Sequence, residues 1–155
     1  MPKRPVSVEA MRLRLAGLCS RTEQCSSDLR RKILRAGLTS AQAGEILSFL
    51  REGRFLDDAR YAAAFASDKV RFAGWGTAKI RAALAAKHIP SDTIAFALAS
   101  IDRAEYIAAF KRSALAKART LDLSDSADIQ RLYRHLATRG YESSLIARAI
   151  SRLKK

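Results

Sequence analysis

The sequence predicts an all-α protein built from three tandem helical modules. Alanine is abundant, long β-branched runs are missing, and prolines occur only at positions 2, 5 and 90, so two long stretches contain no proline to interrupt a helix. The chain also repeats itself, because Gly37, His88 and Gly140 stand in similar surroundings at separations of 51 and 52 residues. Such a period is typical of modules that pack on their neighbours rather than around one globular core.

The repeat includes side chains at fixed distances from these three residues. Apolar residues stand eight and four positions before each of them and one and ten positions after, and a serine follows three positions after. The sets are Leu29, Ile80 and Leu132; Ile33, Leu84 and Leu136; Leu38, Ile89 and Tyr141; Leu47, Leu98 and Ile150; and Ser40, Ser91 and Ser143. We therefore expect a basic tail at residues 1–7 and modules at residues 8–51, 57–100 and 102–154.

Three helices are expected in the first module. Their buried faces recur at helical spacing and consist of Val8, Met11, Leu15 and Leu18; of Leu29, Ile33 and Ala36; and of Ile46, Leu47 and Leu50. Gly37 suits the C′ position of the second helix, which needs a positive φ. A histidine at the equivalent position 88 must adopt that conformation at some cost, or the helix ends differently there. Thr39 or Ser40 caps the third helix, and Gln42 is placed to complete a capping box with Thr39.

The most specific stretch runs from Gly53 to Leu84 and reads GRFLDDARYAAAFASDKVRFAGWGTAKIRAAL. Asp57 is expected to be an N-cap, and Leu56 is expected to pack on Tyr61 as a hydrophobic staple. Asp58 then lies in the first turn, where the helix dipole favours an anion. The spacing of the residues that follow continues this helix through Tyr61, Phe65, Lys69 and Phe72.

A turn follows, because Gly74 and Gly76 flank Trp75 and break the periodicity. The next helix should begin near Thr77, with Ile80 and Leu84 on its buried side.

The same stretch resembles the signature of the RecX family, which comprises small bacterial regulators of the RecA recombinase. The resemblance rests on the run from Phe55 to Ala62, FLDDARYA, then on a basic segment, Gly76, the triplet Lys79-Ile80-Arg81 and Leu84. The residues that we assign to this structural signature are Phe55, Leu56, Asp57, Asp58, Arg60, Tyr61, Phe65, Gly76, Ile80 and Leu84.

The resemblance implies a fold and a partner. RecX-like proteins are built from tandem three-helix modules in an elongated, curved arrangement. They bind along the groove of the RecA filament, suppress its ATPase and strand exchange, and destabilise or cap it. The resemblance thus implies a stoichiometric modulator of recombinational DNA repair and of the SOS response, with no chemistry of its own.

Charge points to a polyanionic partner, either nucleic acid or an acidic protein surface. The chain has 29 Lys and Arg against 15 Asp and Glu, which gives a net charge of +14. The excess is +6 in residues 1–56, +2 in residues 57–101 and +6 in residues 102–155. The candidate filament- or DNA-binding residues are Arg30, Arg31, Lys32, Arg35, Lys69, Arg71, Lys79, Arg81, Lys87, Arg131, Arg134 and Arg139. Each cluster taken alone also fits a merely solvated helix face.

Other residues that could carry chemistry have simpler interpretations. Asp57 and Asp58 are adjacent on a helix and point in different directions, so capping is favoured over a metal or catalytic pair. Trp75 could stack on a base or pack between modules. Cys19 and Cys25 are expected to be free thiols, and neither His88 nor His135 belongs to a zinc or nucleophile motif. We expect no enzyme activity, no cofactor and no metal.

The remaining expectations concern location and a rival function. No stretch approaches the length of a membrane span, and Arg12 and Arg14 interrupt a signal-peptide core, so a cytoplasmic monomer is expected, with an organellar transit peptide as the alternative. The rival function is direct DNA binding by helix-turn-helix units. Their third helices would open with Ser40-Ala41-Gln42, Ser91-Asp92-Thr93 and Ser143-Ser144-Leu145, which are poor base readers.

Overall fold

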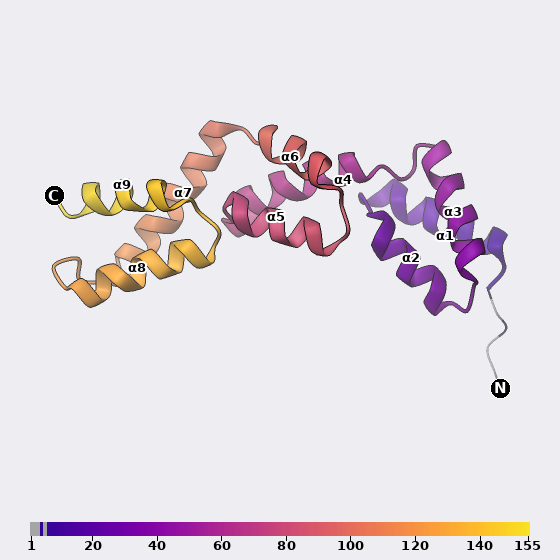
Figure 1. The fold of residues 1–155 in the computed structure, drawn as a ribbon, viewed down its shortest axis with the longest axis horizontal. Coiled ribbons are helices and arrows are strands. Elements are labelled where there is room, and N and C mark those ends of the chain that lie inside the picture. Colours follow the sequence, from indigo (N-terminus) through magenta and orange to yellow (C-terminus); the bar gives the residue numbers. More distant parts are fainter. Residues whose placement is uncertain (1–3, 5) are drawn as a thin grey trace.

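The computed structural model describes residue 4 and residues 6–155, and in this part of the chain every regular element is a helix (Figure 1). The elements are α1 (Val8–Arg21), α2 (Ser26–Arg35), α3 (Ser40–Glu52), α4 (Asp58–Asp68), the π-helical turn η1 (Lys69–Ala73), α5 (Thr77–Ala86), α6 (Ser91–Ala99), α7 (Arg103–Ala118), α8 (Ser126–Thr138) and α9 (Ser143–Leu153). The predicted all-α class is confirmed. Among the described residues, no helix combines the length and apolarity needed to cross a membrane.

The helices follow one another in an elongated row (Figure 1). In the N-terminal group, α1 and α2 both pack on α3. In the middle group, α4 and α5 both pack on α6, and η1 continues from α4 to contact α7. In the C-terminal group, α7 packs on α8 and α8 on α9. The row therefore consists of helices in threes, as the repeat predicts.

Two hydrophobic cores run through this row. The first belongs to α1–α3 and includes Met11, Leu15 and Leu56. The second extends from α4 to α9 without interruption, so the middle and C-terminal groups share one core. The residues eight and four positions before the repeated turn are all fully buried; they are Leu29, Ile33, Ile80, Leu84, Leu132 and Leu136. The spacing of 51 and 52 residues in the sequence is therefore the spacing of equivalent core positions.

The repeated turn is a left-handed helix C-terminus. Gly37, His88 and Gly140 have φ values of 92°, 60° and 94° and follow the C-caps of α2, α5 and α8. After α5, the His88 N–H donates to Ala85 O and the Ile89 N–H to Leu84 O, the two bonds of a Schellman motif. The residue after each left-handed position is buried, which explains the apolar residue there in every repeat. Of the two alternatives expected for His88, the structure shows the left-handed conformation.

Another left-handed C-terminus lies at Arg54, a residue that is not glycine. Arg54 has a φ of 59° and follows Gly53, which has an ordinary φ of −78°. The Phe55 N–H donates to Leu50 O at 2.9 Å and completes the Schellman motif of α3. This turn directs the chain from the N-terminal group into α4.

Helix starts agree closely with the local signals. Thr39 and Gln42 form the complete capping box of α3, and the Asp57 carboxylate accepts from the N–H groups of Ala59 and Arg60 at the start of α4. α3, α6 and α9 begin at the repeated serines, Ser40, Ser91 and Ser143. α5 begins at Thr77, after Gly76.

Two expectations about α4 are wrong. The helix does not continue regularly to Phe72, because the backbone changes to π-helical hydrogen bonding at Lys69, and Phe72 is 82% exposed. The predicted hydrophobic staple between Leu56 and Tyr61 is also not formed. Leu56 is buried in the first core, whereas Tyr61 packs against the second, so the two side chains stabilise different parts of the molecule.

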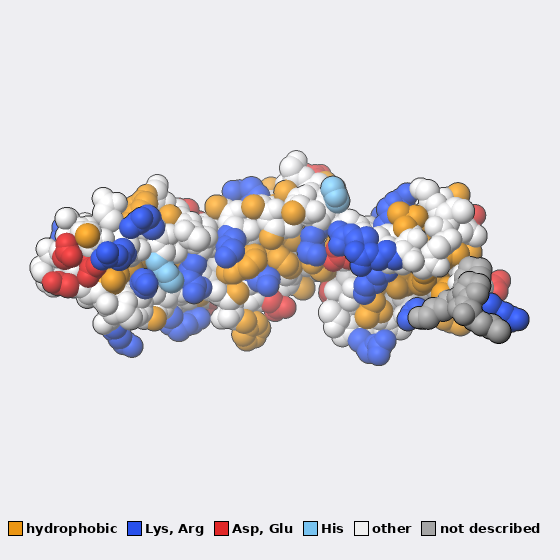
Figure 2. Space-filling view, turned by 90° about the horizontal axis from the view of Figure 1, so that it is seen from below, with side chains coloured by type: hydrophobic (Ala, Val, Ile, Leu, Met, Phe, Trp, Pro, Cys, Tyr) orange, Lys and Arg blue, Asp and Glu red, His pale blue; other side chains and the backbone are white. Residues whose placement is uncertain are grey.

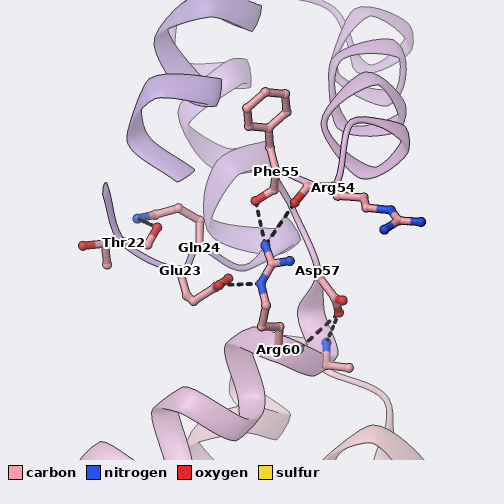
Figure 3. A network of polar contacts seen from close by, with 8 residues as sticks. Thr22, Glu23, Gln24, Arg54, Phe55, Asp57 and Arg60 are labelled. Carbon is pink, nitrogen blue, oxygen red and sulfur yellow. Dashed lines mark hydrogen bonds and ion pairs between the residues drawn. The ribbon is translucent and has the colours of Figure 1, made fainter. Parts of the chain in front are cut away.

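The joint between the N-terminal and middle groups is polar (Figure 3). The Arg60 guanidinium pairs with Glu23 and donates to the carbonyl oxygens of Arg54 and Phe55, each at 3.2 Å. α2 has no side-chain cap of its own, and Asp58 supplies one from α4 by accepting from the Ser26 N–H at 2.8 Å and its hydroxyl at 2.6 Å. The two signature acids therefore cap two different helices.

The same joint holds a cysteine and an ion pair. Cys25 precedes α2 in sequence but packs in the second core. Lys87 at the end of α5 donates to Asp28 on α2 at 2.7 Å, and the Ser27 hydroxyl donates to Lys87 O at 2.6 Å. Cys19 and Cys25 are both free and buried, and burial raises the pKa of both thiols. Low thiolate content makes both groups poor nucleophiles.

A candidate polyanion-binding cleft

The candidate site lies beside a close backbone contact between the middle and C-terminal groups. The Gly76 N–H donates to Arg139 O at 2.7 Å, and the Ala78 N–H donates to Gly140 O at 3.1 Å. A Cβ on Gly76 would lie 2.3 Å from the carbonyl atoms of Gly140, and a Cβ on Gly140 would lie 2.4 Å from the Lys79 nitrogen. Since Gly76 has an ordinary φ of −86°, its role in the signature is this close approach.

Side chains reinforce the contact on both sides of it. The Tyr141 hydroxyl donates to Gly74 O at 2.9 Å, and the Tyr106 hydroxyl donates to the Glu142 carboxylate at 2.8 Å while accepting from the Thr77 N–H at 3.2 Å. Burial, together with the hydrogen bond to Glu142, raises the pKa of Tyr106 to about 12, so its hydroxyl stays protonated. The start of α5 is thereby fixed against the end of α8.

Next to this contact is an open cleft of about 690 Å³, which we call the basic cleft. It is lined by the end of η1 and the turn after it, the start of α5, the last turn of α7, and α8 from Arg131 to its C-cap Arg139. Five of its residues are Lys or Arg, and no acidic residue lines it. The residues that line it are Ala73, Trp75, Lys79, Lys117, Arg131, Arg134, His135, Thr138 and Arg139. Such a concave, single-sign surface concentrates polyanions.

Trp75 forms one wall of the basic cleft and is also packed. Its ring lies edge-on to Phe65 with centroids 6.2 Å apart, and the ammonium groups of Lys69 and Lys79 lie 4.6 Å and 4.5 Å from its centroid. Cation–π contacts of this kind hold lysine side chains in place at an aromatic surface. Trp75 thus packs against Phe65 of α4 and positions two of the predicted cations.

Arg139 connects the basic cleft to the backbone contact. Its Nη1 donates to Ala73 O at 2.8 Å, and its Nε donates to His135 Nε2 at 3.2 Å. Burial, then the charges of Arg139 and Lys117, lower the pKa of His135, so the imidazole is neutral near pH 7 and accepts from Arg139. Lys117 therefore lies close to the residues of α8 that the sequence singled out.

The other predicted cations are divided between two places. On α2, Arg31, Lys32 and Arg35 are exposed, and Arg30 donates to the Ser40 hydroxyl at 2.6 Å. Arg81 is exposed on α5. The structure therefore brings Lys79 of α5 together with three arginines of the α8 region, and it leaves a separate group on α2 that we call the α2 cluster. The three arginines are Arg131, Arg134 and Arg139, and the α2 cluster consists of Arg30, Arg31, Lys32 and Arg35.

Four predicted cations form ion pairs with carboxylates, and they are Arg31, Arg71, Lys87 and Arg131. Arg71 pairs with Glu105 at 2.7 Å, and Lys87 pairs with Asp28 at 2.7 Å across the joint. Arg131 in the basic cleft also pairs with Asp128, one turn away on α8. Arg71 and Lys87 thus have structural partners already, whereas Lys79 and Arg134 face the cleft without an ion pair among the described residues.

Figure 2 gives one face of the molecule, where Lys and Arg side chains gather over the C-terminal group and around the joint between the N-terminal and middle groups. Among the Lys and Arg residues of the basic cleft, Lys117 is the one that the sequence did not single out, because it stands on a first helix rather than on a repeated second helix. Within the described residues, no three His, Cys, Asp or Glu side chains come together as a metal site.

Comparison with known proteins gives a consistent result. Residues 57–98 match the family model described as RecX, second three-helix domain, and residues 104–150 match RecX, third three-helix domain. A protein described as Regulatory protein RecX from Clostridium botulinum (strain Eklund 17B / Type B) is 31% identical over an alignment of 134 residues that covers 81% of this chain. The matched region spans 60% of the length of that relative.

Solved structures of similar fold carry the same description. One, a crystal structure of regulatory protein RecX, has a TM-score of 0.81 at 23% identity and covers 93% of this chain and 73% of its own. Another, of RecX from Lactobacillus salivarius, has a TM-score of 0.80 at 17% identity and covers 94% and 96%. At these identities the likeness concerns the fold. Since the two family models together match more than half of the sequence, the chain belongs to the RecX family of regulatory proteins.

Proposed function

We propose that this protein binds along the groove of the RecA filament and inhibits its ATPase and strand exchange, as a cytoplasmic monomer without catalytic chemistry or a cofactor. In this way it modulates recombinational DNA repair and the SOS response. The target comes from the family resemblance. The observation that supports it most in this chain is the basic cleft, where five Lys or Arg residues from three helices converge on a surface without acids.

The shape of the molecule supports the same proposal. An elongated row of helix groups offers contacts at several points along a filament (Figure 1). The basic cleft lies between the middle and C-terminal groups, and the α2 cluster lies in the N-terminal group. Two separated basic surfaces on one chain allow simultaneous contacts with successive protomers, and the second contact then forms at a high effective concentration.

Direct DNA binding by helix-turn-helix units is the second candidate, favoured by the excess of basic residues. Attraction between the Lys and Arg side chains and the DNA phosphates would alone account for such binding. Recognition of specific DNA bases is less well supported, because the Gln42 side chain at the start of α3 accepts from the Thr39 N–H at 2.8 Å in the capping box. A glutamine used in this way is not free to read an adenine edge.

The test is co-sedimentation with nucleotide-bound RecA filaments, with bare single-stranded DNA as the control. The double variant Lys79→Glu/Arg134→Glu should lose filament binding, because it reverses two cations that face the basic cleft. A matched double variant, Arg14→Glu/Arg81→Glu, makes the same change of net charge at exposed positions on α1 and α5. It should reduce binding less, since both of its sites lie outside the two basic surfaces. Wild-type-like binding by the cleft variant, with retained helicity, would refute the proposal.

A further inference from the structure

A second concave surface lies on the C-terminal group between α7 and α9. This groove has a volume of about 380 Å³ and differs in character from the basic cleft. Phe110 and Ala114 of α7 are almost fully buried beneath it, and its walls are apolar side chains of both helices. The wall residues are Ile107, Leu115, Leu145, Ala149 and Leu153.

The groove exists because the C-terminal group is packed differently from the other two. α1 packs on α3 and α4 packs on α6, so the first and third helices meet in those groups. The structure describes the whole C-terminal group, and there the close contacts are between α7 and α8 and between α8 and α9. The space that a first-to-third helix contact fills elsewhere is therefore left open between α7 and α9.

Four basic residues border the apolar groove on both sides. Arg103 and Lys111 come from α7, and Arg148 and Arg152 come from α9. All four are exposed, none forms an ion pair with a carboxylate of the described chain, and no acidic residue lines the groove. An apolar base between two cationic edges is complementary to an amphipathic ligand whose polar flanks are negative.

We propose that the α7–α9 groove binds an amphipathic acidic helix of a partner protein. The α7 side extends from Arg103 to Leu115 at helical spacing, a rise of roughly 18 Å, which matches about three turns of a partner helix. Such a helix would place apolar side chains at spacings of three and four residues over Phe110 and Ala114, and its carboxylates would reach the cations on either edge. A membrane surface fits less well, because a flat surface does not reach residues that are almost fully buried in a groove.

This binding mode is separate from the contact with the filament proposed above. Arg103, Lys111, Arg148 and Arg152 belong to neither the basic cleft nor the α2 cluster. Loss of function in the basic cleft therefore leaves the groove intact, and a change in the groove leaves the cleft intact. Each proposal can fail without the other.

The experiment uses the full chain and a labelled, designed helical peptide of about fifteen residues, long enough for the three turns that the groove presents. Leucines occupy one face of the peptide and glutamates flank it. We expect saturable binding by fluorescence anisotropy, with amide shifts in NMR spectra confined to α7, α9 and their neighbours. A second peptide, with every glutamate replaced by glutamine, should bind about tenfold more weakly.

Two variants of the groove and one matched control complete the test. Arg148→Glu/Arg152→Glu should weaken peptide binding about tenfold, and Ala149→Trp, which fills the groove, should abolish it. Arg131→Glu/Arg134→Glu makes the same change of charge in the basic cleft and should alter the affinity less than about twofold. Circular dichroism establishes that each variant keeps its helicity. If Ala149→Trp does not fold, the charge-reversed pair decides, because both of its sites are exposed.

Several outcomes would overturn the proposal. Equal losses from the groove and cleft variants would mean that only net charge attracts the peptide. Equal affinity for the glutamate and glutamine peptides would remove the role of the cationic edges. Binding to vesicles of anionic lipid but not to the peptide would assign the groove to a membrane. A dimer in sedimentation that Ala149→Trp converts to a monomer would assign it to a second copy of this chain.

Discussion

Gly76 and Gly140 meet backbone to backbone, and a Cβ on Gly76 would lie 2.3 Å from the carbonyl carbon and oxygen of Gly140. Neither of these two backbone segments can move without breaking the hydrogen bonds from the Gly76 N–H to Arg139 O and from the Ala78 N–H to Gly140 O. This contact lies next to the core that α4–α9 share and positions the basic cleft. It therefore links the stability of the two helix groups to the geometry of the candidate site.

Replacing Gly76 by alanine should consequently destabilise the protein by about 3 kcal/mol, the upper part of the range for overpacking, because backbone atoms rather than a flexible side chain must shift. Chemical denaturation measures the change. Gly44→Ala is the matched control: Gly44 lies within α3, and a Cβ there meets nothing within 4 Å. That variant should gain roughly 0.5–1 kcal/mol from helix propensity. Similar effects from both substitutions would contradict the role of the close contact.

The two signature acids should be separable by hydrogen exchange. Asp57→Ala should cost about 1 kcal/mol and speed exchange at the start of α4, where the carboxylate accepts from Ala59 and Arg60. Asp58→Ala should instead speed exchange at the start of α2, because Asp58 accepts from the Ser26 N–H across the joint. Asp58→Asn keeps an acceptor and should be milder. Exchange that rises only in α4 for both alanine variants would rule out capping between the groups.

The ion pair of Asp28 and Lys87 should make the joint sensitive to acid. Burial acts to raise the pKa of Asp28, but the hydrogen bonds from Lys87 and Cys25 and the nearby positive charge outweigh it and hold the pKa below the usual value of 3.8. The hydrogen bond to Asp28 correspondingly raises the pKa of Lys87 above 10.5. Stability from the pair is thus present between those two values.

The stability that the Asp28–Lys87 pair contributes is lost as the pH falls through the lowered pKa of Asp28, and again as the pH rises through the raised pKa of Lys87. Asp28→Asn should therefore be about 1 kcal/mol less stable than the wild type near pH 7. This difference should vanish near pH 2. Denaturation at both pH values measures it, and a difference that persists unchanged in acid would show that the pair is not its source.

Much of the fold could be predicted from the sequence because the signals are local. Leu29, Ile80 and Leu132 repeat because each fills the same core position, and Thr39 and Asp57 are caps whose partners lie within three residues. The left-handed turn at His88 could be found by alignment with the two glycines. Arg54 takes the same conformation but does not align with those glycines, and an arginine side chain by itself does not indicate a positive φ.

Features that depend on contacts between groups could not be predicted. The π-helical hydrogen bonds of η1 change the phase of the helix, so Phe72 turns to solvent while Val70 is buried, and side-chain spacing alone does not reveal this. Asp58 looks like any acid in a first turn, and its partner Ser26 is 32 residues away. Lys117 joins the basic cleft through the packing of α7 on α8. The roles of these residues become visible only in the tertiary structure.

Salt should distinguish filament binding from plain DNA binding. Attachment of a chain with a net charge of +14 to naked DNA should weaken steeply as salt rises, because each neutralised phosphate releases counterions. Recognition of a protein groove should retain more affinity. Inhibition of the recombinase ATPase should therefore persist at salt concentrations that abolish binding to DNA. If both decline along one salt curve, competition for DNA explains the activity.

The last prediction concerns the two ends of the molecule. Arg31 and Arg134 stand six residues before Gly37 and Gly140, on α2 and α8 in the N-terminal and C-terminal groups, and the equivalent residue of the middle group is Ala82. If both ends hold the filament, loss of either removes the advantage of a second contact at high effective concentration. Arg31→Glu and Arg134→Glu should each raise the concentration for half-inhibition substantially, and the double variant should nearly abolish inhibition.

Arg81→Glu is the matched control, because it reverses an exposed charge on α5, outside both basic surfaces. It should do less than either end variant, although it changes the net charge equally. Arg31 lies 3.7 Å from Asp28, so its reversal also disturbs the carboxylate that pairs with Lys87, and helicity and stability must be measured beside inhibition. Equal effects of the three single reversals would mean that net charge alone matters. An effect confined to Arg81 would place the binding surface on the middle group.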